Sequence, residues 1–90
     1  MVDPHPRTIV VLAGGISHER DVSLRSGRRV ADSLAEHGVK VILRDPDASL
    51  LQFLSDTSFD VVWPTLHGAS GEDGALRALL DFMSVPYVGS

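Results

Sequence analysis

Hydrophobic positions along the chain fall into short continuous runs that are separated by longer amphipathic segments. Three runs rich in β-branched and apolar residues span residues 8–13, 39–44 and 59–63. Runs of this length and composition are typical of strands that are buried on both faces, as in parallel sheets. A fourth run, residues 85–88, predicts the start of another strand.

The intervening segments have the apolar spacing of amphipathic helices, at positions i, i+3, i+4 and i+7. The first helix is expected to begin between Ser17 and Asp21, which are both suitable N-caps, and to end at Gly38. A short second helix is expected around residues 50–54, and a third carries its apolar face between residues 76 and 83.

This order of elements predicts an α/β fold that forms one domain, residues 1–90. We expect a small, Rossmann-like parallel sheet of four strands, in the order 2-1-3-4, with helices on both faces. The side chains expected in its core are Val10, Leu12, Leu34, Val41, Val62, Leu79 and Leu80. Because an uncovered sheet edge is a liability that a further helix would normally relieve, we expect the domain to be part of a larger protein.

The composition argues against several classes of site and partner. The chain has no cysteine, so disulfides, thiolate metal ligands and cysteine nucleophiles are excluded. No apolar run approaches the ~18 residues that cross a bilayer and no signal peptide is recognisable, so we expect a cytoplasmic protein without a membrane partner. The net charge is −4, and the basic cluster Arg25, Arg28 and Arg29 has no interleaved aromatic residue, so no nucleic-acid partner is expected.

Two polar, glycine-rich stretches follow the first and third predicted strands, at Gly14–Ser23 and Leu66–Gly74. Ligands of open parallel sheets bind beyond the carboxyl ends of the strands. With the strand order 2-1-3-4 the two stretches are neighbours, so Glu19 and His67 are candidates to face one pocket. Both also have a structural interpretation, because an acid at a helix start gains about 0.3–1 kcal/mol from the helix dipole and a histidine can bond to backbone groups.

Other kinds of site find little support in the sequence. The pair Gly14-Gly15 lacks the third glycine of a dinucleotide-binding turn, and no Gly-Lys-Ser or Gly-Lys-Thr sequence of a P-loop is present. Asp45 and Asp47, which follow the second predicted strand, suit a ribose contact and a turn equally well. No trio of His, Asp and Glu has zinc-binding spacing, so no metal site is expected in this chain.

Three motifs occur in order along the chain. The most specific consists of His67-Gly68, two variable positions, and Gly71-Glu72-Asp73-Gly74. The others are Gly14-Gly15-Ile16-Ser17-His18-Glu19-Arg20-Asp21-Val22-Ser23 and Pro86-Tyr87-Val88-Gly89-Ser90. With these motifs the chain resembles the N-terminal substrate domain of the D-alanine–D-alanine ligases, from about Thr8 to Ser90. Asp21 and Arg77 depart from the residues that are usual in the family, both on expected helix surfaces.

The resemblance implies a three-domain ATP-grasp ligase that joins two D-alanines for the peptidoglycan of the cell wall. In that family ATP and magnesium activate the carboxylate of one D-alanine as an acyl phosphate, which the amine of a second D-alanine attacks. Glu19 is then the expected catalytic residue, holding the ammonium of the first D-alanine, with Val22 near its methyl group and His67 lining the same site. ATP and magnesium would bind outside residues 1–90, the chain alone would not be catalytically competent, and the enzyme would form a homodimer.

Two alternatives remain open at the level of sequence. A nucleotide-binding half-domain of another enzyme would bind NAD or ATP through these residues. A non-enzymatic α/β interaction module would leave Glu19 and His67 dispensable. The resemblance does not distinguish D-alanine from D-lactate or D-serine as the second substrate.

Overall fold

The computed structural model describes residues 7–15, 19–66 and 72–88, and its elements alternate between strands and helices. In chain order they are β1 (Thr8–Leu12), α1 (Arg20–Glu36), β2 (Lys40–Arg44), α2 (Leu50–Asp56), β3 (Val61–Pro64) and α3 (Glu72–Phe82). The predicted alternation is confirmed, and α1 begins within the interval expected from its candidate caps.

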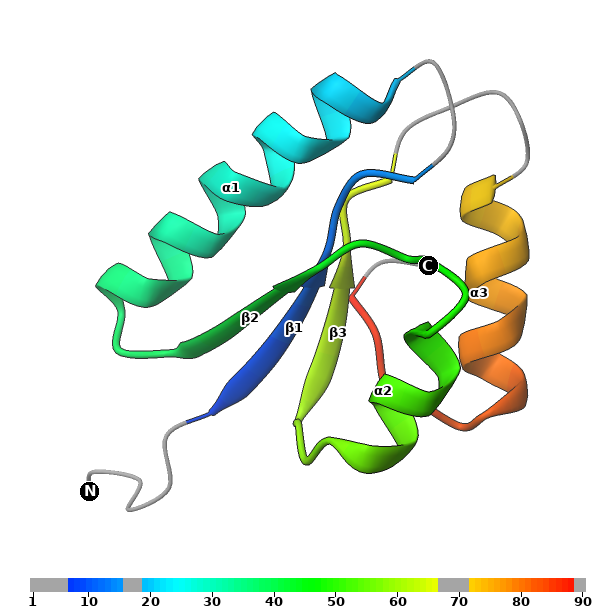
Figure 1. The fold of residues 1–90 in the computed structure, drawn as a ribbon. Helices are drawn as coiled ribbons and strands as arrows, with labels where there is room; N and C mark the ends of the chain where they lie inside the picture. The colour runs from blue at the N-terminus through cyan, green and yellow to red at the C-terminus, as the bar shows by residue number, and fades with distance from the viewer. Residues whose placement is uncertain (1–6, 16–18, 67–71, 89–90) are drawn as a thin grey trace.

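β1 is the central strand of a three-stranded parallel sheet with the order β2-β1-β3. Helix α1 covers one face of this sheet, and α2 and α3 cover the other, as predicted (Figure 1). Successive side chains of a strand point to opposite faces, so a central strand that is covered on both sides must be apolar throughout. Val10, Val11 and Leu12 are accordingly all fully buried.

The prediction of a four-stranded sheet, order 2-1-3-4, is wrong for the described residues, because the chain after α3 makes only one parallel bridge, between Val62 and Tyr87. The Val62 N–H donates to the carbonyl of Pro86 at 2.9 Å, and the Val88 N–H donates to the carbonyl of Val62 at 2.9 Å. The nitrogen of residue 86 also faces β3 in such a ladder, and proline has no N–H to donate. The segment therefore lies beside β3 without extending into a strand.

The main hydrophobic core lies between the sheet and helices α2 and α3. Its buried residues are Val10, Leu12, Leu50, Leu54, Val62, Leu66, Leu76 and Leu80. Three residues that were expected in the core, Leu34, Val41 and Leu79, are only partly buried. Val41 belongs to the edge strand β2, and Leu34 lines an open cavity beside Trp63. Leu79 lines an open groove between α2 and α3.

Helix α1 packs close to β1 because residue 27 is glycine. A Cβ atom at Gly27 would lie 2.4 Å from Cβ of Ala13, 3.2 Å from Oγ1 of Thr65 and 3.4 Å from Cδ1 of Leu43. Close helix–strand packing is the role that the third glycine has in dinucleotide-binding turns. Here the same close contact is made from within the helix.

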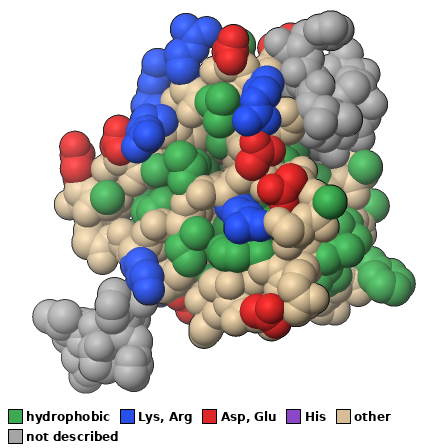
Figure 2. Space-filling view, in the orientation of Figure 1, with side chains coloured by type: hydrophobic (Ala, Val, Ile, Leu, Met, Phe, Trp, Pro, Cys, Tyr) green, Lys and Arg blue, Asp and Glu red, His purple; other side chains and the backbone are tan. Residues whose placement is uncertain are grey.

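The opposite side of α1 faces solvent and carries several arginines. Blue basic side chains lie over this helix in Figure 2, with red acidic ones beside them, and Arg25, Arg28 and Arg29 are all exposed. Among the described residues no helix is both long enough and apolar enough to span a membrane.

Candidate functional site

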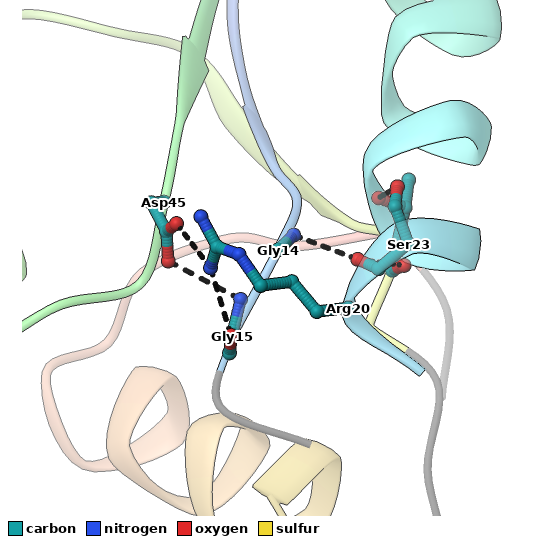
Figure 3. A network of polar contacts seen from close by, with 6 residues as sticks. Gly14, Gly15, Arg20, Ser23 and Asp45 are labelled. Atoms are coloured by element: carbon teal, nitrogen blue, oxygen red, sulfur yellow. Dashed lines mark hydrogen bonds and ion pairs between the residues drawn. The ribbon is translucent and has the colours of Figure 1, made fainter. Parts of the chain in front are cut away.

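A buried hydroxyl joins the turn after β1 to the first turns of α1. Ser23 is 0% exposed, and its Oγ accepts the N–H of Gly14 at 2.8 Å (Figure 3). The same hydroxyl donates to the carbonyl of Thr65 at 2.8 Å. Ser23 therefore connects the turn after β1 with the residue that directly follows β3.

Thr65 holds the end of β3 against the end of β1. Its N–H and its Oγ1 both donate to the carbonyl of Leu12, each at 2.8 Å. Oγ1 also lies 3.4 Å from the carbonyl oxygen of Ser23. Three elements, β1, β3 and α1, thus meet at a small buried network of hydroxyl and backbone groups, and both candidate loops leave from it.

A second, half-exposed network holds the other side of the turn. Asp45 directly follows β2, and its Oδ1 accepts the N–H of Gly15 at 3.2 Å. Its Oδ2 pairs with a guanidinium nitrogen of Arg20 at 2.6 Å, and the same nitrogen donates to the carbonyl of Gly15 at 2.8 Å (Figure 3). Gly14 has φ +110°, and a Cβ atom there would lie 2.7 Å from Oδ2 of Asp45, so this turn requires glycine.

These contacts bear directly on nucleotide binding. A phosphate-binding turn presents its backbone N–H groups to the ligand at a helix N-terminus. In this turn the Gly14 N–H is bonded to Ser23 and the Gly15 N–H to Asp45, whose carboxylate is paired with Arg20. The described part of the turn therefore offers neither glycine N–H to ATP or a dinucleotide, which weakens the support for a nucleotide-binding half-domain.

Asp47 has a structural task as well. Its Oδ1 accepts the N–H of Ser49 at 2.9 Å and the hydroxyl of Ser49 at 2.6 Å, just before α2 begins. These hydrogen bonds lower the pKa of Asp47 below its usual value, with a smaller contribution from the charge of Arg44. Within the described part of the chain no cluster of three or more His, Asp or Glu side chains could hold a metal ion.

The structure places two of the three predicted site residues at the start of α1. Glu19 is the N-cap of this helix, its carbonyl accepts the N–H of Ser23 at 2.9 Å, and its side chain is exposed. Val22 is 41% exposed and lies three residues further, on the same side of the helix. His67 lies outside the described residues, whereas Thr65 and Leu66 just before it are buried.

Sequence reasoning missed the residues that organise this site, namely Ser23, Thr65, Arg20 and Asp45. One signal was available for Ser23, which precedes Gly27 by four residues and therefore extends the buried side of α1. A small polar residue in a buried helical stripe indicates a satisfied internal hydrogen bond. Thr65, Arg20 and Asp45 make their contacts with residues of other elements. These contacts depend on how the elements are placed relative to one another, which the sequence pattern does not show.

Comparison with known proteins gives one consistent result. Residues 46–90 match the family described as D-ala D-ala ligase N-terminus. The chain is 46% identical over 82 residues to the D-alanine–D-alanine ligase of Pseudoalteromonas translucida, which is 91% of this chain and 27% of that protein. It is 43% identical over 84 residues to the D-alanine–D-alanine ligase of Desulforudis audaxviator, which is 93% of this chain and 28% of that protein.

The solved structures agree with the sequence relatives. The crystal structure of the D-alanine–D-alanine ligase from Bacillus anthracis complexed with ATP has a TM-score of 0.73 and 25% sequence identity, over 92% of this chain and 28% of that one. This chain thus spans about a quarter of the length of the relatives that it matches. It belongs to the D-alanine–D-alanine ligase family and corresponds to the N-terminal part of these enzymes.

Proposed function

We propose that residues 1–90 form the N-terminal substrate domain of a D-alanine–D-alanine ligase, which joins two D-alanines in an ATP-dependent reaction for peptidoglycan synthesis. Membership of the ligase family, together with the exposed carboxylate at the start of α1, carries this proposal. The domain contributes one wall of the active site and is inactive on its own.

The proposed role of Glu19 is to hold the ammonium of the first D-alanine. The residue is the N-cap of α1 and its side chain is exposed at the carboxyl end of the sheet, where ligands of such folds bind. A carboxylate fixes the position of an ammonium group and favours its protonated form, which keeps that amine from reacting while the carboxylate of the same molecule is activated. This is catalysis by positioning and by charge.

Val22 and His67 complete the proposed contacts with the first D-alanine. Val22 would pack near the methyl group, and this role is supported by its partial exposure and by its place one helical turn after Glu19. His67 would line the same site from the loop after β3, and its support is the ligase motif that it begins.

ATP and magnesium are proposed to bind in other parts of the enzyme, where ATP supplies the activation of the carboxylate. This proposal is supported by the described part of the turn after β1, where the N–H groups of Gly14 and Gly15 are already bonded to Ser23 and Asp45. We further propose a cytoplasmic homodimer with no nucleic-acid or membrane partner. Light scattering of the enzyme tests the dimer, and a monomer at roughly 100 μM would contradict it, because a Kd in that range marks only weak association.

The test of the proposed function is the variant Glu19→Gln in the full-length enzyme. It keeps the size of the side chain and removes its charge, so kcat/KM for the first D-alanine should fall by roughly 10²-fold or more, because the ammonium loses its partner. The KM for ATP should change little. Asp21→Asn is the matched control, since it removes an equal charge from the same helical turn on another side of α1. Equal kinetics for the two variants would contradict the role of Glu19.

A further inference from the structure

We propose that Ser23 and Thr65 are positioning residues for D-alanine binding, which set Glu19 at the start of α1 relative to the end of β3. This inference rests on the proposed function, because it assigns these hydroxyls a role through Glu19. Neither residue is exposed enough to contact a substrate, since Ser23 is 0% and Thr65 is 7% exposed.

Ser23 is linked to Glu19 through the backbone of α1. The N–H of Ser23 donates to the carbonyl of Glu19 at 2.9 Å, which closes the first turn of α1. The hydroxyl of Ser23 accepts a hydrogen bond from the N–H of Gly14 and donates one to the carbonyl of Thr65, each at 2.8 Å. The start of α1, with Glu19 as its N-cap, is thereby fixed to the ends of two strands.

The residues directly after β3 are held by the same network. The N–H, Oγ1 and carbonyl of Thr65 are all engaged, the first two by the carbonyl of Leu12 and the third by Ser23. The next residue, Leu66, is buried in the main core. Thr65 and Leu66 are therefore fixed at the end of β3 by the same network and core that hold the start of α1.

Hydroxyl groups suit these two positions for a physical reason. Apolar contacts tolerate small sliding movements, whereas hydrogen bonds of fixed length and direction hold two elements in one arrangement. A displacement of about 1 Å at a substrate contact can cost roughly 10²-fold in rate. A pair of buried hydroxyls between α1 and β3 is suited to prevent such a displacement of Glu19.

The experiment uses the full-length enzyme with Ser23→Ala and, separately, Thr65→Val, which removes the hydroxyl at nearly constant volume. In each variant the KM for the first D-alanine should rise about tenfold or more, while the KM for ATP stays within about twofold of the original. Thr65→Ser keeps the hydroxyl and should restore most of the D-alanine affinity. Should Ser23→Ala fail to fold, Ser23→Cys keeps the size of the side chain with a weaker donor and takes its place.

Leu54→Ala is the control for a loss of stability alone. Leu54 is buried in the core on the opposite face of the sheet from α1. Its truncation lowers the melting temperature, and assays well below that temperature should show an unchanged KM for D-alanine. A merely structural role of Ser23 and Thr65 would give this same pattern, and that result would overturn the proposal.

A double variant separates this inference from the proposed function. If Ser23 acts through Glu19, Ser23→Ala should add little to the D-alanine defect of Glu19→Gln, so the two effects are not additive. Fully additive effects would overturn the positioning role. If Glu19→Gln alone leaves the kinetics unchanged, the proposed function itself fails. If Glu19→Gln is defective but Ser23→Ala and Thr65→Val behave like Leu54→Ala, only the positioning role fails.

Discussion

Replacing Gly27 by alanine tests how closely α1 must approach β1. The added Cβ would lie 2.4 Å from Cβ of Ala13, whereas carbon atoms in packed interiors are about 3.5–4 Å apart. Neither atom can turn away, since a Cβ is bonded directly to the backbone. The helix or the strand must therefore move by about 1 Å. The nearby Thr65 Oγ1, at 3.2 Å, would be displaced as well.

The expected free energy combines two opposing effects. Overpacking of a rigid contact costs about 1–3 kcal/mol, and the upper half of this range applies because no rotamer change relieves it. Alanine gains about 0.5–1 kcal/mol over glycine within a helix. Gly27→Ala should therefore lower the free energy of unfolding by about 1–2.5 kcal/mol, which corresponds to a Tm decrease of roughly 4–20 °C for a domain of this size.

Gly74→Ala is the matched control for this prediction. Gly74 is also helical, in α3, and nothing lies within 4 Å of the place where its Cβ would stand. Only the helix propensity then changes, so Gly74→Ala should stabilise the protein by about 0.5–1 kcal/mol. Thermal unfolding followed by circular dichroism measures both variants. A Gly27→Ala protein as stable as the original, or shifted like Gly74→Ala, would refute the close contact.

Four further outcomes are expected. Ser23→Ala leaves two buried backbone groups unpaired and should destabilise the protein by about 2–3 kcal/mol in urea unfolding; a change under about 0.5 kcal/mol would contradict the network. The pKa of Asp47 is lowered in the folded protein, so Asp47 contributes to stability at pH values above its ordinary pKa of 3.8. This contribution is lost as the pH falls below that value. Asp47→Asn should therefore flatten the acid side of the stability profile. The hydrogen bond from Tyr87 to Asp81 raises the pKa of Tyr87 above 10.0, so its contribution is lost only as the pH rises beyond that value. Tyr87→Phe should be less sensitive to alkaline pH, and an unchanged profile would argue against the bond. Finally, the purified 90-residue chain should release no phosphate from ATP in the presence of D-alanine, and detectable release would contradict the proposed division of the active site.

The fold could be predicted from the sequence where one element carries its own signal. The apolar run of β1 required burial on both faces, and the polar start and glycine end of α1 set its limits. The fourth strand was mispredicted because the apolar character of residues 85–88 outweighed a single proline, whose missing N–H ends the ladder. Burial of Leu34 was overestimated, because helical spacing shows which side of a helix is apolar and not how completely a neighbour covers it.

The location of the candidate site could be predicted from the sequence, but only some of the residues that form it could. The position of Glu19 follows from local helix rules, and the meeting of the start of α1 with the end of β3 follows from the order of the strands. The contact between Ser23 and Thr65 joins residues that are 42 positions apart, so it depends on the exact depth at which α1 lies on the sheet. That depth is set by Gly27. The role of a glycine in close packing cannot be recognised from the helix pattern until the residue opposite it, here Ala13, is known.

The turn between β1 and α1 illustrates how one location in an open parallel sheet can be suited to ligands of opposite charge. A phosphate site offers free N–H groups at the helix start. Here internal oxygen atoms already accept the N–H groups of Gly14 and Gly15. Glu19, the N-cap of α1, adds an exposed carboxylate, while the guanidinium of Arg20 is paired with the carboxylate after β2. Under the proposed function the carboxylate of Glu19 favours an ammonium group over a phosphate. The fold alone would permit either ligand, and we expect the side chain of Glu19 to decide between them.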